Sequence, residues 1–262
     1  MVIHKERYEQ VLNNWLLSKK SHIKEQSYIK YYNIIKNNIV PVLGKYKVNR
    51  ITQDILDTYF QSKEIKKLSL SSQNTIYYII KSSLNNKNIS FNNYNIKKPK
   101  SKIIYLTNTE EKILLDYINN NINLNNLGIL ICLYTGIRIG EVCALRWEDI
   151  DFINNTISIK RTSQRISNID GNSLKKTKII VTTPKSTNSI QTIPVNSSIM
   201  SILKDNYANN NYYILTGSNT PKDTRVYEKY FENLLRKCNL RKINFHSLRH
   251  TFATRCIESE LM

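Results

Sequence analysis

The fold is constrained most by a change in sequence texture near residue 85. Before that point, apolar residues recur at the spacing of one helix face in several segments joined by short connections. The expected helices cover residues 4–20, residues 24–40 ended by Pro41, a segment capped by Thr52, and a segment that starts at Ser71 or Ser72. Amphipathic helices with short joins bury their stripes against one another, so we expect a small all-helical bundle.

Between Asn85 and Lys102 the periodicity is lost, and the sequence becomes rich in Asn and Lys, with Pro99 near its end. Such a stretch is typical of a linker between domains and not of a helix or strand packed in a core. We therefore expect a helical domain over residues 1–92, a basic linker over residues 93–104 and a second domain over residues 105–262.

The second domain mixes helical and strand patterns. Thr107 and Glu110 have the spacing of a capping box at the start of a helix. Strands are expected at residues 156–160, 178–183 and 190–195, the last two paired across a turn, and helices at residues 196–206 and 224–238. The expected fold class is mainly α with a small β-sheet: a helical bundle followed by an α+β domain.

The chain has a strong excess of positive charge, with 39 Lys and Arg against 20 Asp and Glu, a net charge of +19. Such an excess repels itself unless a polyanion is near, and nucleic acid is the usual partner. An AT-rich coding sequence would also enrich Lys, which is an alternative source of part of the excess. Hydrophobic residues make up 40% of the chain, enough for packed cores.

Features of a secreted or membrane protein are lacking in this sequence. Cys132, Cys143, Cys238 and Cys256 are far apart without metal-ligand spacing, so buried free thiols in a reducing compartment are expected. The N-terminus opens with charged residues, and the longest apolar run, Leu127–Tyr134, is too short to span a bilayer. We expect a soluble, cytoplasmic protein without membrane association.

A glycine turn at Thr135–Glu141 joins the apolar run to a new helix. Arg138 is expected in the first turn of that helix, where the helix dipole disfavours a cation but where an anion such as phosphate is well placed. Glu141 lies three residues further on the same face and is positioned to hold the guanidinium. An ordinary surface arginine beside a glycine turn is the alternative.

Two more basic motifs lie towards the C-terminus. In the segment 245–254, His246 and Arg249 are three residues apart and share a helix face, so an anion between them is favoured. Lys185 lies in the turn between the last two expected strands, where a surface lysine is the alternative reading. The order of Arg138, Lys185 and the His246–Arg249 pair is a far more specific signal than any one of them.

These blocks resemble the tyrosine recombinases, or phage-type integrases, and most closely those of conjugative transposons. The matching blocks are Pro41–Gly44 with Ile51 and Thr52, Thr135–Glu141, Pro184–Ser186 with Ile193–Val195, and His246–Thr254. The resemblance covers nearly the whole chain. It implies a core-site DNA-binding domain followed by a catalytic domain, and an activity in site-specific DNA recombination or integration through a phosphotyrosine link.

The resemblance also implies a role for each matching residue. Arg138 and Arg249 would bind the non-bridging oxygens of one DNA phosphate, with Glu141 orienting Arg138. Lys185 would protonate the departing 5′ hydroxyl, and His246 would bond the phosphate or share proton transfer. No metal or cofactor is implied. Lysines expected to follow the DNA backbone are Lys19, Lys20, Lys98, Lys100 and Lys102.

The attacking tyrosine of the family should follow the second arginine, but no tyrosine follows His246, and Tyr227 and Tyr230 lie on a helix expected to be packed. The chain is therefore expected to be a fragment, a truncated product or a subunit supplied with tyrosine by a neighbour, and inactive alone. The expected partners are double-stranded DNA and further copies, dimer to tetramer, in a bacterial cytoplasm, at the nucleoid when bound. The alternatives are a non-catalytic DNA-binding protein that occupies integration sites and a type IB topoisomerase.

Overall fold

The computed structural model describes residues 6–85, 102–169, 175–182 and 191–260. The chain divides into two compact units, Met1–Ser101 and Lys102–Met262. Lys98, Lys100 and Lys185 lie outside the described residues.

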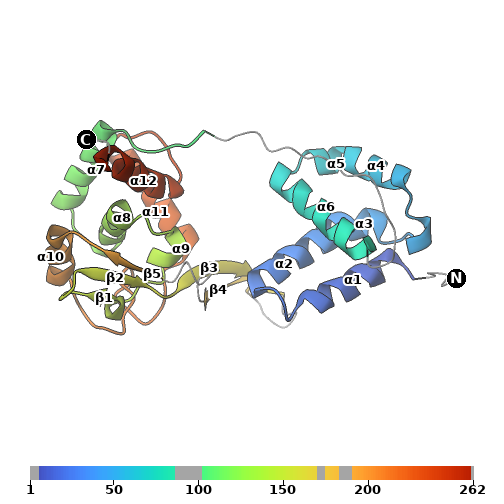
Figure 1. The fold of residues 1–262 in the computed structure, drawn as a ribbon, viewed down its shortest axis with the longest axis horizontal. Helices are drawn as coiled ribbons and strands as arrows, with labels where there is room; N and C mark the ends of the chain where they lie inside the picture. Colours follow the sequence, from blue (N-terminus) through green and yellow to red (C-terminus); the bar gives the residue numbers. More distant parts are fainter. Residues whose placement is uncertain (1–5, 86–101, 170–174, 183–190, 261–262) are drawn as a thin grey trace. The chain divides into compact units, whose positions relative to one another are not determined.

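The N-terminal unit is a helical bundle, as the apolar stripes predicted (Figure 1). Its elements are α1 (Tyr8–Lys19), α2 (Glu25–Ile34), a π-helix (Ile35–Ile39), α3 (Val40–Leu43), a 3₁₀ turn (Val48–Arg50), α4 (Gln53–Gln61), α5 (Lys63–Lys66) and α6 (Leu70–Asn85). The stripes of α1, α4 and α6 meet in one core, with Leu12, Leu56 and Ile79 almost fully buried. Thr52 caps α4 by accepting a hydrogen bond from the Ile55 amide, which confirms the predicted start.

The predicted helix end at Pro41 is wrong. The chain passes from α2 through a wide π turn at Ile35–Ile39 directly into α3, which contains Pro41 in its first turn. Proline is tolerated there because its missing N–H would have no partner within that helix. The chain leaves the helical path only at Gly44.

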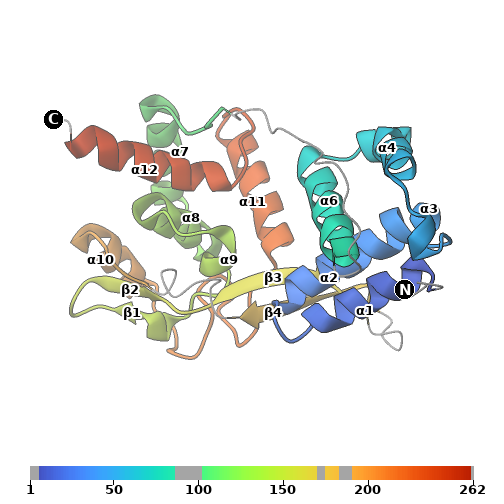
Figure 2. The same cartoon turned by 45° about the vertical axis from the view of Figure 1, so that its right-hand side comes forward.

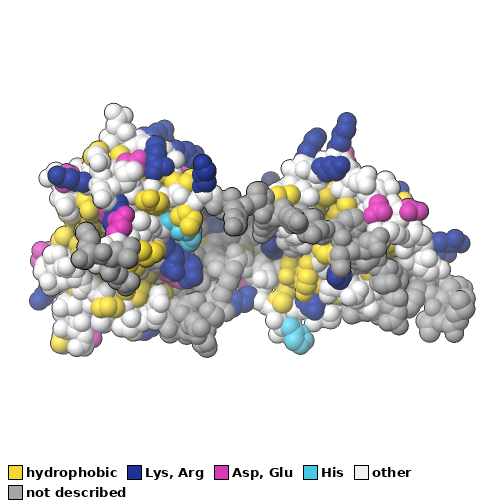
Figure 3. All heavy atoms as spheres, turned by 45° about the horizontal axis from the view of Figure 1, so that its top comes forward, with side chains coloured by type: hydrophobic (Ala, Val, Ile, Leu, Met, Phe, Trp, Pro, Cys, Tyr) yellow, Lys and Arg dark blue, Asp and Glu magenta, His cyan; other side chains and the backbone are white. Residues whose placement is uncertain are grey.

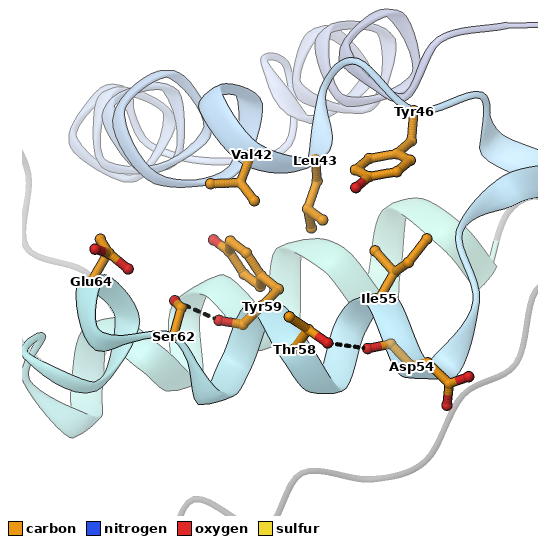
Figure 4. Close-up of a pocket in the computed structure, with 9 residues that line it drawn as sticks. All are labelled: Val42, Leu43, Tyr46, Asp54, Ile55, Thr58, Tyr59, Ser62 and Glu64. Carbon is orange, nitrogen blue, oxygen red and sulfur yellow. Dashed lines mark hydrogen bonds between the residues drawn. The ribbon is translucent and has the colours of Figure 1, made fainter.

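An apolar groove of about 440 Å³ runs between α3 and α4 (Figure 4). Its apolar lining is formed by Val42, Leu43, Tyr46, Ile55 and Tyr59. The hydroxyls of Thr58 and Ser62 donate to main-chain carbonyls within this segment, those of Asp54 and Tyr59. Those hydroxyls are therefore committed to local bonds, and the groove presents mainly apolar surface.

The C-terminal unit packs helices around the central helix α8 (Figures 1 and 2). Its elements are α7 (Asn108–Asn120), α8 (Leu124–Thr135), α9 (Ile139–Val142), a 3₁₀ turn (Trp147–Asp149), β1 (Ile150–Asp151), β2 (Thr156–Ile159), β3 (Thr162–Ser167), β4 (Thr177–Thr182), β5 (Gln191–Pro194), α10 (Ser197–Asp205), α11 (Thr224–Lys237) and α12 (His246–Glu260). Helix α8 contacts α7, α9, α10, α11 and α12, and it lies between α12 on one side and β1 and β2 on the other. The mainly helical fold class with small sheets is confirmed.

The strand pairing differs from the prediction. Strand β5 pairs antiparallel with β2, with Ile193 opposite Ile157, and not with β4. Strand β4 instead pairs with β3, a strand that the sequence patterns did not predict, so the unit has a three-stranded sheet β1-β2-β5 and a separate hairpin β3-β4. The pairing was missed because Thr162–Ser167 lacks regular apolar alternation.

The expectation that all four thiols are buried is correct for Cys132, Cys143 and Cys238 and wrong for Cys256, which is exposed on α12. Helix α12 packs against α8, and Leu248 in its first turn and Phe245 just before the helix are both buried.

Candidate phosphate-binding site

The turn after α8 brings the chain sharply from one helix to the next. Gly136 ends α8 in the left-handed conformation, with φ of 63°, a geometry that residues with a Cβ adopt only at a cost. A Cβ at Gly136 would lie 2.5 Å from Cδ1 of Phe252 on α12, so glycine also permits this close approach. The turn is thus set by backbone conformation and by α12 together.

Arg138 follows this turn and is the N-cap of α9, in extended conformation. The sequence placed Arg138 one position later, inside the first turn. The buried Glu141 carboxylate accepts the Arg138 main-chain N–H at 2.7 Å and the Arg138 Nη1 at 2.8 Å. The Arg138 side chain remains 50% exposed while that of Glu141 is 4% exposed. The predicted contact is confirmed, and it anchors the guanidinium while leaving half of the side chain to solvent.

Helix α12 carries two further residues of the candidate site, His246 and Arg249. The Asn244 side chain accepts the Ser247 amide at 3.0 Å at the start of the helix, so His246 lies in its first turn and Arg249 one turn on. Nη1 of Arg249 donates to the main-chain oxygen of Gly136 at 2.6 Å. Arg249 therefore reaches the same turn that positions Arg138, although the two arginines are far apart in the sequence.

His246 lies close to the two arginines and to His250. Burial lowers the pKa of His246 below its ordinary value of 6.5, and the nearby His250, Arg249 and Arg138 lower it further. A lowered pKa keeps the imidazole neutral near pH 7, able to donate one hydrogen bond without adding charge. Two guanidiniums with a neutral imidazole form a suitable site for one tetrahedral oxyanion.

The space-filling view shows histidine and basic side chains of this unit at the surface. On the C-terminal unit, at the left of Figure 3, histidine atoms lie beside Lys or Arg side chains and hydrophobic atoms. The site is therefore accessible to a large anionic ligand.

The segment that leads into α7 holds α12 in place, a feature the sequence analysis did not find. The Leu106 amide donates to Thr251 Oγ1 at 2.9 Å, and Arg255 Nη2 donates to the Leu106 oxygen at 2.9 Å. Arg255 also forms an ion pair with Glu111 at 2.6 Å. These contacts cross about 145 residues of sequence, and the local pattern gives no signal for them.

A second tether lies at the loop before α12. Arg241 Nε donates to Glu110 at 2.6 Å and its Nη2 to the Tyr105 oxygen at 2.7 Å. The hydrogen bond from Arg241 lowers the pKa of Glu110 to about 2. Glu110 accepts the Thr107 amide in the capping box that the sequence predicted. Glu110 thus both caps α7 and holds the loop that precedes α12.

The predicted DNA-contacting lysines are only partly described. Lys20 and Lys102 are exposed, and the Lys19 ammonium lies over the Trp15 ring at 5.7 Å from its centroid. Lys98, Lys100 and the proposed acid Lys185 fall outside the described residues.

Neither tyrosine of α11 has a reactive setting. Tyr227 is fully buried and donates to the Asn125 oxygen at 2.7 Å, and burial raises its pKa well above 10. Tyr230 donates to Asn126 Oδ1 at 2.8 Å. Both hydroxyls are engaged in hydrogen bonds with the N-terminal part of α8, which agrees with the packed helix predicted from the sequence.

The described part of the chain lacks both a cluster of metal ligands and a membrane-spanning helix. No group of three or more His, Cys, Asp or Glu side chains among those residues is arranged to hold a metal ion. Within the same ranges, no helix has both the length and the apolar character needed to cross a bilayer.

Comparison with protein families matches both units. The phage integrase family model matches residues 104–261, and the N-terminal SAM-like domain of phage integrases matches residues 7–64.

Curated relatives are longer than this chain. A XerC-like tyrosine recombinase of Caldanaerobacter subterraneus subsp. tengcongensis is 30% identical over 146 residues, covering 49% of this chain and 37% of its own. The ICEBs1 integrase of Bacillus subtilis is 22% identical over 255 residues, covering 89% of this chain and 66% of its own. The chain thus spans less than two thirds of the length of these relatives.

Solved structures share the fold. The Tn1549 transposon integrase in complex with transposon right end DNA has a TM-score of 0.75 at 19% identity, covering 97% of this chain and 87% of its own. A lambda integrase tetramer bound to a Holliday junction has a TM-score of 0.68 at 16% identity, covering 98% and 72%.

Proposed function

The chain belongs to the phage integrase family, and from this premise we propose that it binds duplex DNA and supplies the phosphate clamp for site-specific strand cleavage and rejoining. The observation that carries the proposal is the bond from Arg249 to the Gly136 oxygen, since it brings the second arginine to the turn of the first. The fold likeness to integrases solved with DNA supports DNA as the ligand.

In the proposed reaction, the hydroxyl of a tyrosine other than the two on α11 attacks the phosphorus and loses its proton to water. A 3′-phosphotyrosyl bond forms and the bond to the 5′ oxygen breaks. Arg138 and Arg249 bind the non-bridging oxygens and stabilise the charge that develops there. Neutral His246 donates a hydrogen bond to the same phosphate, and Lys185 gives a proton to the departing 5′ oxygen. Glu141 fixes Arg138, so little reorganisation is needed when the phosphate arrives.

The proposed partners are duplex DNA and further copies of the chain. Lambda integrase has been solved as a dimer on a core site and as a tetramer on a Holliday junction, which supports an oligomer on DNA. We propose that Lys19, Lys20, Lys98, Lys100 and Lys102 neutralise backbone phosphates. The net charge of +19 supports this role.

The test measures affinity for a mixed-sequence duplex by fluorescence anisotropy across a salt series. The logarithm of the affinity should fall against the logarithm of salt with a slope of about −0.9 for each phosphate neutralised. A flat salt response would overturn the proposal of DNA as partner.

The clamp itself is tested by a double-mutant cycle. Arg138→Gln and Arg249→Gln should each weaken binding, and together they should cost less than the sum, because both side chains contact one phosphate. Lys204→Gln, which removes one exposed charge on α10, is the matched control and should have a smaller effect. Strict additivity of the two arginine variants would show that they do not share a ligand.

A further inference from the structure

A second histidine on α12 has no role in the proposed clamp chemistry. Building on the proposed function, we propose that His250 is a positioning residue, which holds the His246 imidazole in the orientation that meets the DNA phosphate. The role is indirect: His250 acts through His246 and does not itself contact the reacting atoms.

The geometry carries this assignment. His246 and His250 are one helical turn apart on α12, and residues at this spacing are neighbours on a helix surface. Their ring centroids are 4.7 Å apart with an interplanar angle of 85°, an edge-to-face contact. Edge-to-face packing fixes the relative orientation of two rings.

His246 needs such a restraint. The torsion that turns an imidazole about its Cβ–Cγ bond has a broad energy profile, so packing or a hydrogen bond must fix the ring. Within the described residues, the ring contact of His246 is with His250. The neighbouring His250 ring is thus the described contact that restrains the orientation of His246.

The charged groups around His246 favour the same arrangement. Arg138 at the N-cap of α9, and Arg249 and His250 on α12, all disfavour a charged His246, while Glu141 is engaged with Arg138. A neutral imidazole has one N–H, so its orientation decides whether that N–H meets an anion. Orientation therefore matters more here than it would for a doubly protonated ring.

The first experiment is a double-mutant cycle on duplex affinity in the full 262-residue chain. His246→Ala should weaken binding by about tenfold, the scale of one hydrogen bond to a charged group. His250→Ala should approach the same loss, and the double variant should be no weaker than His246→Ala alone. His250→Phe, which retains a ring, should restore most of the affinity.

Three results would overturn the proposal. The first is that His250→Ala binds like the parent chain, and the second is that its loss adds fully to that of His246→Ala. The third is that His250→Phe binds no better than His250→Ala. Full additivity would place His250 in direct contact with DNA. The thermal midpoint of each variant is measured alongside, and His250→Phe keeps the cycle interpretable should His250→Ala fail to fold.

A second experiment needs no DNA, so it separates failure of this inference from failure of the proposed function. NMR of the His246 ring should show a ring-current shift and a single orientation in the parent chain and in His250→Phe. Both signatures should be lost in His250→Ala. An unchanged His246 spectrum in His250→Ala would refute the positioning role even if DNA binding were fully established.

Discussion

Replacement of Gly136 by alanine tests the turn on which the candidate site depends. The left-handed backbone at this position costs about 1–2 kcal/mol for a residue with a Cβ. The new Cβ would lie 2.5, 3.1 and 3.2 Å from three ring atoms of Phe252, and overpacking of this kind costs about 1–3 kcal/mol. Gly136→Ala should therefore destabilise the C-terminal unit by about 2–5 kcal/mol.

The assay is urea or thermal unfolding of the full chain, followed by the fluorescence of Trp147 in a Trp15→Phe background. Trp147 is buried in the core of the C-terminal unit, so its emission reports that unit alone. At about 2–4 °C for each kcal/mol in a domain of this size, the midpoint should fall by roughly 4–20 °C.

The chain offers a matched control and a cycle. Gly217 also has a positive φ, of 59°, but a Cβ there would meet only the end of the Leu124 side chain at 3.1 Å, so Gly217→Ala should cost about 1–2 kcal/mol. Combining Gly136→Ala with Phe252→Ala should recover about 1–3 kcal/mol relative to the sum of the single effects. If Gly136→Ala cost no more than Gly217→Ala, the close approach of α12 to this turn would be refuted.

Two further predictions concern charged side chains of the same unit. Arg241 lowers the pKa of Glu110 from 4.5 to about 2, so this carboxylate stabilises the folded chain above pH 4.5 and loses that effect as the pH falls towards 2. Arg241→Gln should flatten the fall of unfolding free energy over this range, measured by urea unfolding at several pH values; an unchanged slope would contradict the pairing. Arg161→Met should cost about 3 kcal/mol, because it removes the guanidinium partner of Asp149, whose side chain is only 2% exposed. The loss should not be larger, because Lys160 remains as a cationic partner of Asp149. The half-exposed Lys160 gives the control: Lys160→Met should cost less than about 1 kcal/mol, and equal losses would refute the role of burial.

Local patterns predicted the helices well. Helix starts at Thr52 and Thr107 were predictable because a capping side chain bonds amides within its own first turn. The partner of β5 was not predictable, because strand pairing depends on chain segments distant in sequence. The sequence suggested a hairpin with β4, whereas β5 pairs with β2, where the half-buried Ile193 lies opposite the buried Ile157.

In the candidate site too, the local contact was predictable from the sequence and the long-range contact was not. The ion pair between Arg138 and Glu141 was predictable, because three residues on one helix face are neighbours. The contact of Arg249 with the Gly136 oxygen spans 113 residues and is fixed only when α12 packs on α8. Motif order predicted that Arg249 lies near the turn that carries Arg138, but it gave no information on the Gly136 carbonyl to which Arg249 donates.

That carbonyl makes Gly136 the junction of the site. One residue ends α8, admits the Phe252 ring and accepts Arg249, and the chain reaches Arg138 two residues later. Each guanidinium therefore has a fixed protein partner, the Gly136 carbonyl for Arg249 and the Glu141 carboxylate for Arg138. Donors held in this way are in place before an anion arrives, and the interaction does not have to offset the cost of ordering them. A change that shifts α12 along α8 would move Arg249 away from Gly136 without altering Arg138, so any loss of the proposed affinity for DNA should follow helix packing and not net charge.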